Sequence, residues 1–151
     1  MYRKKAIPAV GHVQGEYRVA AWAVDRCRHQ ADADPSIHNA SKIELNEFRR
    51  CGVTLEATYL IRLFAVFESH LRDIWARAFE RDTHPIVRDL IDGCAARQGV
   101  PDDILAHAHE VRVYRNSLVH GGEAPQVILG GARQYLYTYL GGMPPEWQSS
   151  N

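Results

Sequence analysis

The sequence predicts an all-α protein, an antiparallel bundle of about four to five helices in a single domain. Apolar residues recur three and four positions apart along most of the chain, which is typical of amphipathic helices. Proline and glycine stand between these stretches, where helices begin and end. With 151 residues, 46% hydrophobic and 24% charged, the chain is suited to one globular core. That core is expected at about residues 14–143, between a flexible N-terminus and a flexible C-terminal tail.

The first helix is expected from Gly15 to about Asp32. Its apolar face is formed by Tyr17, Ala20, Ala21, Val24 and Cys27. Residues 31–40 are expected to follow as a polar loop, with Pro35 ending the helical pattern.

The second helix is predicted to start at a capping box formed by Ser41 and Glu44, whose side chains would satisfy free backbone amides there. It is expected to run to about Glu80, with a bend near Gly52. Its second half carries the strongest apolar pattern of the chain, at Leu60, Phe64, Phe67, Leu71, Ile74, Trp75 and Ala78.

Two further helices are predicted from proline and glycine positions. Pro85 opens the third helix, which ends by Gly99. Pro101 opens the fourth, because proline suits the first helical position. Asp102 and Asp103 support this start, since acidic side chains suit the positive end of the helix dipole.

The fourth helix is expected to stop at Gly121 and Gly122 with a left-handed C-terminal cap. A last short helix is expected around residues 131–140. The tyrosines there alternate as in a strand, but no other strand signal exists and the bundle context favours a helix: Tyr135, Tyr137 and Tyr139.

Charge and cysteine content narrow the classes of function. Eighteen Lys and Arg balance eighteen Asp and Glu, so a protein that binds nucleic acid through overall charge is excluded. No apolar run is long enough to span a bilayer, and none follows the basic N-terminus as in a signal peptide. The widely spaced Cys27, Cys51 and Cys94 fit buried reduced thiols, so a cytoplasmic location is expected.

Arg115 occupies an unusual place on the predicted fourth helix. On a helical wheel it lies in the middle of an apolar stripe formed by Ile104, Ala108, Val111, Leu118 and Val119. Arginine is seldom buried without a partner. One interpretation is an ion pair within the bundle to Glu68, which lies between Phe64 and Leu71. The other is that the stripe packs against a second subunit, so that Arg115 faces a cleft.

His120 lies five residues further on, at the end of the same helix. Imidazole can transfer protons near neutral pH, and a guanidinium group stabilises phosphate charge. Together, Arg115 and His120 predict chemistry at a phosphate group.

These residues resemble a known family. Arg115-Asn-Ser-Leu-Val-His120, followed by Gly121-Gly122, is similar to the R-(polar)-x-x-x-H motif of the HEPN superfamily, small helical domains of prokaryotic toxins and defence systems. Residues 60–72, with an aromatic-Glu-x-x-Leu core, look like the long helix of that family. Residues 134–140, followed by Met143-Pro144, resemble its closing helix.

The resemblance covers about residues 55–145 and implies a metal-independent endoribonuclease of toxin or phage-defence type, without a cofactor. It implies a homodimer through the helix bearing Arg115, with both motifs in one cleft. His120 would then act as general acid or base at the ribose 2′-hydroxyl, while Arg115 stabilises the phosphorane. Asn116 would orient the substrate or the histidine. RNA, with tRNA as a candidate, is the implied substrate, and an antitoxin or sensor the implied partner.

Further residues are expected to bind the substrate. Arg112 and Tyr114 are assigned to it, the tyrosine by stacking on a base, and Glu68 is expected at the same site. Other basic residues expected to hold the RNA backbone are Arg62, Arg72, Arg3, Lys4 and Lys5.

Two other interpretations bear on function. His107 and His109 do not predict a metal site, because side chains two residues apart on a helix point about 200° from each other. The alternative to a nuclease is a non-catalytic RNA-binding or protein-interaction module, in which the helix bearing Arg115 forms a dimer interface.

Overall fold

The protein is a bundle of α-helices, seen here in a computed structural model that describes residues 3–78 and 83–141. The described part contains six α-helices and no β-strand, which confirms the predicted all-α class. In chain order the helices are α1 (Arg3–Ala33), α2 (Ser36–Ser41), α3 (Leu45–Ala78), α4 (Val87–Gln98), α5 (Asp102–His120) and α6 (Leu129–Gly141). None of them is long and apolar enough to cross a membrane.

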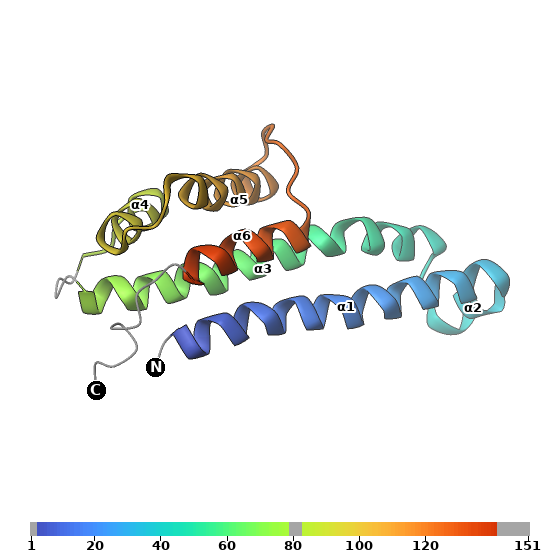
Figure 1. Cartoon of the computed structure of the whole chain (residues 1–151). Helices are drawn as coiled ribbons and strands as arrows, with labels where there is room; N and C mark the ends of the chain where they lie inside the picture. Colours follow the sequence, from blue (N-terminus) through green and yellow to red (C-terminus); the bar gives the residue numbers. More distant parts are fainter. Residues whose placement is uncertain (1–2, 79–82, 142–151) are drawn as a thin grey trace.

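The two longest helices, α1 and α3, lie side by side and run antiparallel, joined at one end through α2 (Figure 1). Helix α6 packs against both of them, and α5 packs against α3 and α6. Helix α4 contacts α3 and α5 near the far end of the bundle. Helix α3 therefore contacts α1, α4, α5 and α6, and its apolar face organises the core.

The core is formed largely as the apolar pattern of α3 predicts. Leu60, Phe64, Phe67 and Leu71 are buried, and Ile74 and Trp75 are half-buried against them. The buried ring of Tyr139 on α6 meets Phe67 edge-on, with 5.4 Å between ring centroids. Its hydroxyl donates a 2.7 Å hydrogen bond to the backbone oxygen of Ile91 on α4. This bond gives the buried phenol the partner that burial requires.

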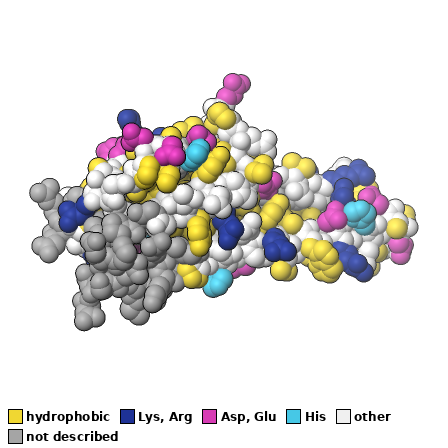
Figure 2. Space-filling view, viewed as in Figure 1, with side chains coloured by type: hydrophobic (Ala, Val, Ile, Leu, Met, Phe, Trp, Pro, Cys, Tyr) yellow, Lys and Arg dark blue, Asp and Glu magenta, His cyan; other side chains and the backbone are white. Residues whose placement is uncertain are grey.

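The outer half of the α1–α3 pair, at the end joined through α2, is thin in the sense that it buries few side chains. Among the described side chains of residues 18–57, only Ala31 is buried, so the expected burial of Cys27 and Cys51 is wrong. Val19, Trp22 and Val53 are 68%, 65% and 82% exposed. Figure 2 shows charged and hydrophobic side chains interspersed over this outer part of the molecule. The apolar core therefore lies in the other half, where α4, α5 and α6 cover α3.

The first helix begins earlier than the expected start at Gly15. Helix α1 starts at Arg3, and both Val10 and Val13 are buried in the core. Pro8 lies in the second turn, past the first four N–H groups that have no helical partner, so it removes one backbone hydrogen bond near the start of α1. The prediction was wrong because local propensity around Pro8 and the glycines is low, whereas burial of the two valines depends on α3 and α6.

The capping box predicted at Ser41 and Glu44 is displaced. Residues 36–41 form the short helix α2, and α3 begins only at Leu45. Glu47 occupies the reciprocal position, since its carboxylate accepts a 2.8 Å hydrogen bond from the backbone N–H of Glu44. Ser41 instead accepts the backbone N–H of Ile43 at 3.2 Å and stabilises the turn.

The later helices follow the sequence prediction closely. Helix α4 ends one residue before Gly99, and α5 begins directly after Pro101 and ends at His120. Gly121 and Gly122 both have positive φ, 79° and 115°. The ψ of Gly121 is 170°, so the chain leaves α5 in an extended direction and not through the expected left-handed cap.

A close approach at Gly93 on α4 yields a stability prediction. A β-carbon at Gly93 would lie 2.5 Å from the indole of Trp75, so Gly93→Ala forces the ring to move. We expect a loss of about 1–3 kcal/mol in unfolding free energy, measured by urea denaturation. Gly15→Ala is the control, because its β-carbon would meet nothing within 4 Å and should stabilise the helix by about 0.5–1 kcal/mol. Equal effects of the two changes would contradict this packing.

His70 on α3 yields a prediction about pH. Its Nδ1 is buried without a hydrogen-bond partner in the described part of the chain, and burial lowers the pKa of the imidazole, opposed by the nearby carboxylate of Asp73. The unfolded chain therefore binds the proton more readily than the folded chain does. The unfolding free energy is thus unaffected by protonation of His70 above about pH 6.5 and decreases as the pH falls below that value. In paired urea titrations, wild type should lose stability relative to His70→Gln on acidification. Parallel pH curves would refute the assignment.

Candidate functional site

The residues predicted to carry chemistry lie on the C-terminal half of α5. Its first three turns anchor it, because Ala108 and Val111 are fully buried against the core. Tyr114 and Leu118 continue this packing as half-buried side chains. Arg115 lies between them in the chain and is itself half-buried. The apolar stripe predicted from the sequence is therefore buried or half-buried as far as Leu118, whereas Val119 is exposed.

Arg115 is held by weak contacts and by no carboxylate of residues 3–78 and 83–141. Its guanidinium carbon lies 5.8 Å from the ring centroid of Phe64, a cation–π contact. One terminal nitrogen, Nη1, donates a 3.0 Å hydrogen bond to the side-chain oxygen of Asn116. Its Nε is buried and has no partner among the described residues. A half-buried cation without a counter-charge is suited to an anionic ligand.

Glu68, which one interpretation of the sequence pairs with Arg115, is bound elsewhere. Its Oε1 accepts hydrogen bonds from Nε and Nη2 of Arg72, at 3.0 and 2.7 Å. Arg72 also donates to the backbone oxygen of Pro85 at 3.2 Å. Because Arg72 lies one turn along α3 from Glu68, it reaches the carboxylate without crossing between helices. The predicted ion pair to Arg115 does not form in the described part of the chain.

His120 is the last residue of α5, and its side chain is exposed. The structure shows no hydrogen bond from His120 to Arg115 or Asn116 within the described residues. Helical spacing instead places Asn116 and His120 in one row with Arg112, four residues apart each time. Val113 and Val119, on the same side of the helix, are 42% and 45% exposed. One exposed face of α5 therefore combines the polar row with apolar side chains.

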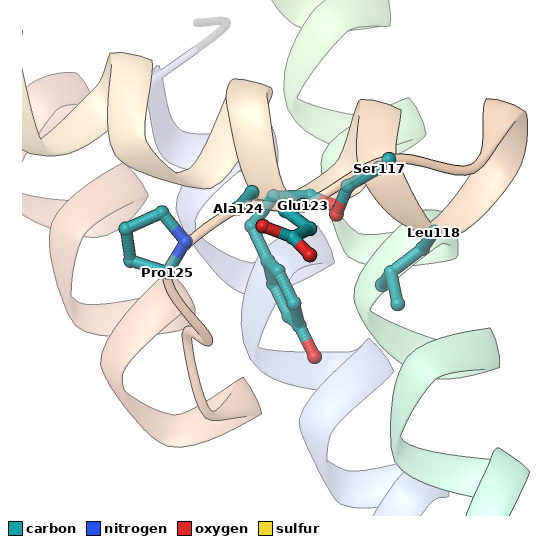
Figure 3. A pocket seen from close by; sticks show the side chains of 7 residues that line it. Ser117, Leu118, Glu123, Ala124 and Pro125 are labelled. Carbon is teal, nitrogen blue, oxygen red and sulfur yellow. The ribbon is translucent and has the colours of Figure 1, made fainter.

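Tyr114 lines a shallow pocket of about 640 Å³ between the end of α5 and the segment that follows it (Figure 3). Ser117 and Leu118 form the helix side of the pocket. Gly122, Glu123, Ala124 and Pro125 form the other side. The predicted base-stacking tyrosine thus borders open space next to His120, although neither His120 nor Arg115 lines the pocket.

Arg112 belongs to a hydrogen-bonded cluster that the sequence did not reveal. Its Nε donates a 3.2 Å hydrogen bond to Nδ1 of His109, whose Nε2 lies 2.7 Å from Oδ1 of Asp92 on α4. His107, the other histidine considered, stacks on Tyr135 of α6 with ring centroids 4.1 Å apart. The spacing of His109 and Arg112 was a local signal for their contact, but nothing in the sequence placed Asp92 beside them.

The other residues predicted to bind the RNA backbone either pair with acidic side chains or have side chains outside the described part of the chain. Arg62 pairs with Glu16 of α1. Arg72 pairs with Glu68, as described above. The remaining predicted basic residues belong to the first turn of α1, whose side chains lie outside the described part: Arg3, Lys4 and Lys5. The closing Met143-Pro144 pair also lies outside the described residues.

No grouping of three or more histidine, cysteine, aspartate or glutamate residues able to hold a metal ion occurs within residues 3–78 and 83–141. Comparison with protein-family models, curated proteins and solved structures finds no match to this chain.

The surroundings of Arg115 predict how the fold tolerates its loss. Arg115→Met removes an unpaired buried donor and keeps contact with Phe64 through a thioether. We expect the unfolding free energy to change by less than about 1 kcal/mol in urea denaturation. Arg72→Met is the matched control, because it strands the carboxylate of Glu68 and should cost more. A loss of about 3–5 kcal/mol at Arg115 would instead indicate a structural ion pair.

Proposed function

We propose that this protein is a metal-independent endoribonuclease of the HEPN type, acting in the cytoplasm in a toxin or phage-defence role. The observation that carries the proposal is the half-buried guanidinium of Arg115, which has no carboxylate partner among the described residues and lies five residues before an exposed histidine. A cation kept without a counter-charge is costly for stability, and binding a phosphate would offset that cost.

The chemistry of the two residues fits phosphoryl transfer from RNA. Neutral His120 would accept the proton of a ribose 2′-hydroxyl, whose oxygen attacks the adjacent phosphorus. Arg115 would stabilise the charge that develops on the phosphorane oxygens. The bond from phosphorus to the 5′-oxygen then breaks, and the leaving oxygen takes a proton from a second imidazole. The products are a 2′,3′-cyclic phosphate and a 5′-hydroxyl end.

A second copy of the chain would supply that second imidazole. Support comes from the exposed Val113 and Val119, which lie on the same side of α5 as His120. Packing of this face against its symmetry mate would bury both valines and bring two copies of the motif together. Asn116 would hold the guanidinium of Arg115 through the hydrogen bond described above.

The proposal predicts cleavage of RNA without metal. Purified protein is incubated with total tRNA and rRNA in EDTA, and fragments are analysed for 2′,3′-cyclic phosphate ends. Wild type should give discrete fragments, whereas Arg115→Met and His120→Ala should each be slower by about a hundredfold or more.

The matched control is His12→Ala, which removes an exposed histidine of α1 and should cleave like wild type. Melting temperatures of all variants establish that they are folded. Fragments of equal intensity from His120→Ala would overturn the mechanism. Intact RNA in every lane, with a stable dimer, would favour the non-catalytic interaction module instead.

A further inference from the structure

We infer that Asp92, His109 and Arg112 form a phosphodiester-binding site beside the proposed catalytic residues, in which Asp92 and His109 position Arg112. That the ligand is the RNA backbone rests on the proposed function. The geometry of the site rests on two hydrogen bonds alone, one between α4 and α5 and one within α5.

The direction of these hydrogen bonds follows from the donors. The Nε–H of Arg112 can only donate, so Nδ1 of His109 must offer its lone pair. The single proton of the neutral imidazole then lies on Nε2 and is donated to Oδ1 of Asp92, 2.7 Å away. The imidazole is therefore neutral and in one tautomer when it joins the carboxylate to the guanidinium. Arg88 also faces this carboxylate, with its Nε 3.8 Å from the other oxygen.

The interposed histidine matters for what Arg112 can bind. A direct ion pair with Asp92 would occupy two of the guanidinium donors. The histidine takes only Nε, so the two terminal amino groups keep four N–H donors, which meet no acceptor among the described residues. Such an edge matches two oxygens of a phosphate. Because Nε is fixed, the plane of the guanidinium is set before the ligand arrives.

The place of Arg112 on α5 connects this site to the proposed chemistry. Asn116 and His120 follow it at intervals of four residues, about 6 Å each along the helix axis. A strand whose scissile phosphate lies at Arg115 and His120 would therefore pass Arg112 with a neighbouring phosphate. Arg112 binds that phosphate, and Asp92 and His109 act through it as positioning residues.

The test measures binding of a labelled single-stranded RNA to the full chain carrying His120→Ala, so that cleavage does not interfere. In this background, Arg112→Ala and His109→Leu should each weaken binding about tenfold. The loss of one phosphate contact should also reduce the slope of log K against log salt by about 0.7. The double variant should bind RNA no more weakly than Arg112→Ala alone, because both changes remove the same phosphate contact.

His109→Gln distinguishes positioning from simple packing. Its amide can donate to Asp92 and accept from Arg112, so it should bind RNA nearly as the background does. Arg26→Ala is the charge control, since it removes an exposed cation of α1 outside the cluster and should leave the salt slope unchanged. In the nitrogen NMR spectrum, His109 should be the neutral Nε2–H tautomer.

The outcomes separate this inference from the proposed function. Unchanged binding in His109→Leu, a glutamine variant as weak as the leucine variant, or an Nδ1–H tautomer overturns the inference. If wild type still cuts RNA in those cases, the nuclease proposal stands. RNA that is bound through Arg112 but never cut overturns the nuclease and supports this site. Absence of any RNA binding overturns both.

Discussion

The apolar face of α3 is the constraint on which the rest of the molecule depends. Phe64, Phe67 and Leu71 on this face are buried within the core, where α3 contacts α5 and α6. The same face sets the position of Arg115, whose guanidinium rests over Phe64. The core and the candidate site are therefore built on the same side chains, and a change in α3 that shifts Phe64 would be felt at Arg115.

Much of the fold could be predicted because its signals are local. The proline, aspartate and glycine residues at the ends of α4 and α5 mark where these helices begin and end to within a few positions, and the apolar period of α3 is long and regular. The start of α1 could not be predicted in this way. Burial of Val10 and Val13 depends on helices far along the chain, and this tertiary contribution outweighs the low propensity around Pro8.

The candidate site, like the fold, could be predicted only where its signals are local. That Arg115 lies within an apolar stripe follows from helical periodicity, and the structure agrees. The sequence did not show which cation Glu68 pairs with. In the structure Glu68 pairs with Arg72, which is nearer because it lies one turn away on the same helix. The contact of His109 with Asp92 joins residues 17 positions apart on different helices. Only the packing of α4 on α5 brings those two side chains together.

The thin outer half of the α1–α3 pair has a consequence for cooperativity. With Ala31 as its only buried described side chain, this segment contributes little of the apolar burial that couples elements into one unfolding unit. It can open as a separate unit of low free energy while α4, α5, α6 and the facing half of α3 remain assembled. Opening of the outer half would therefore leave the buried side chains around the candidate site in place.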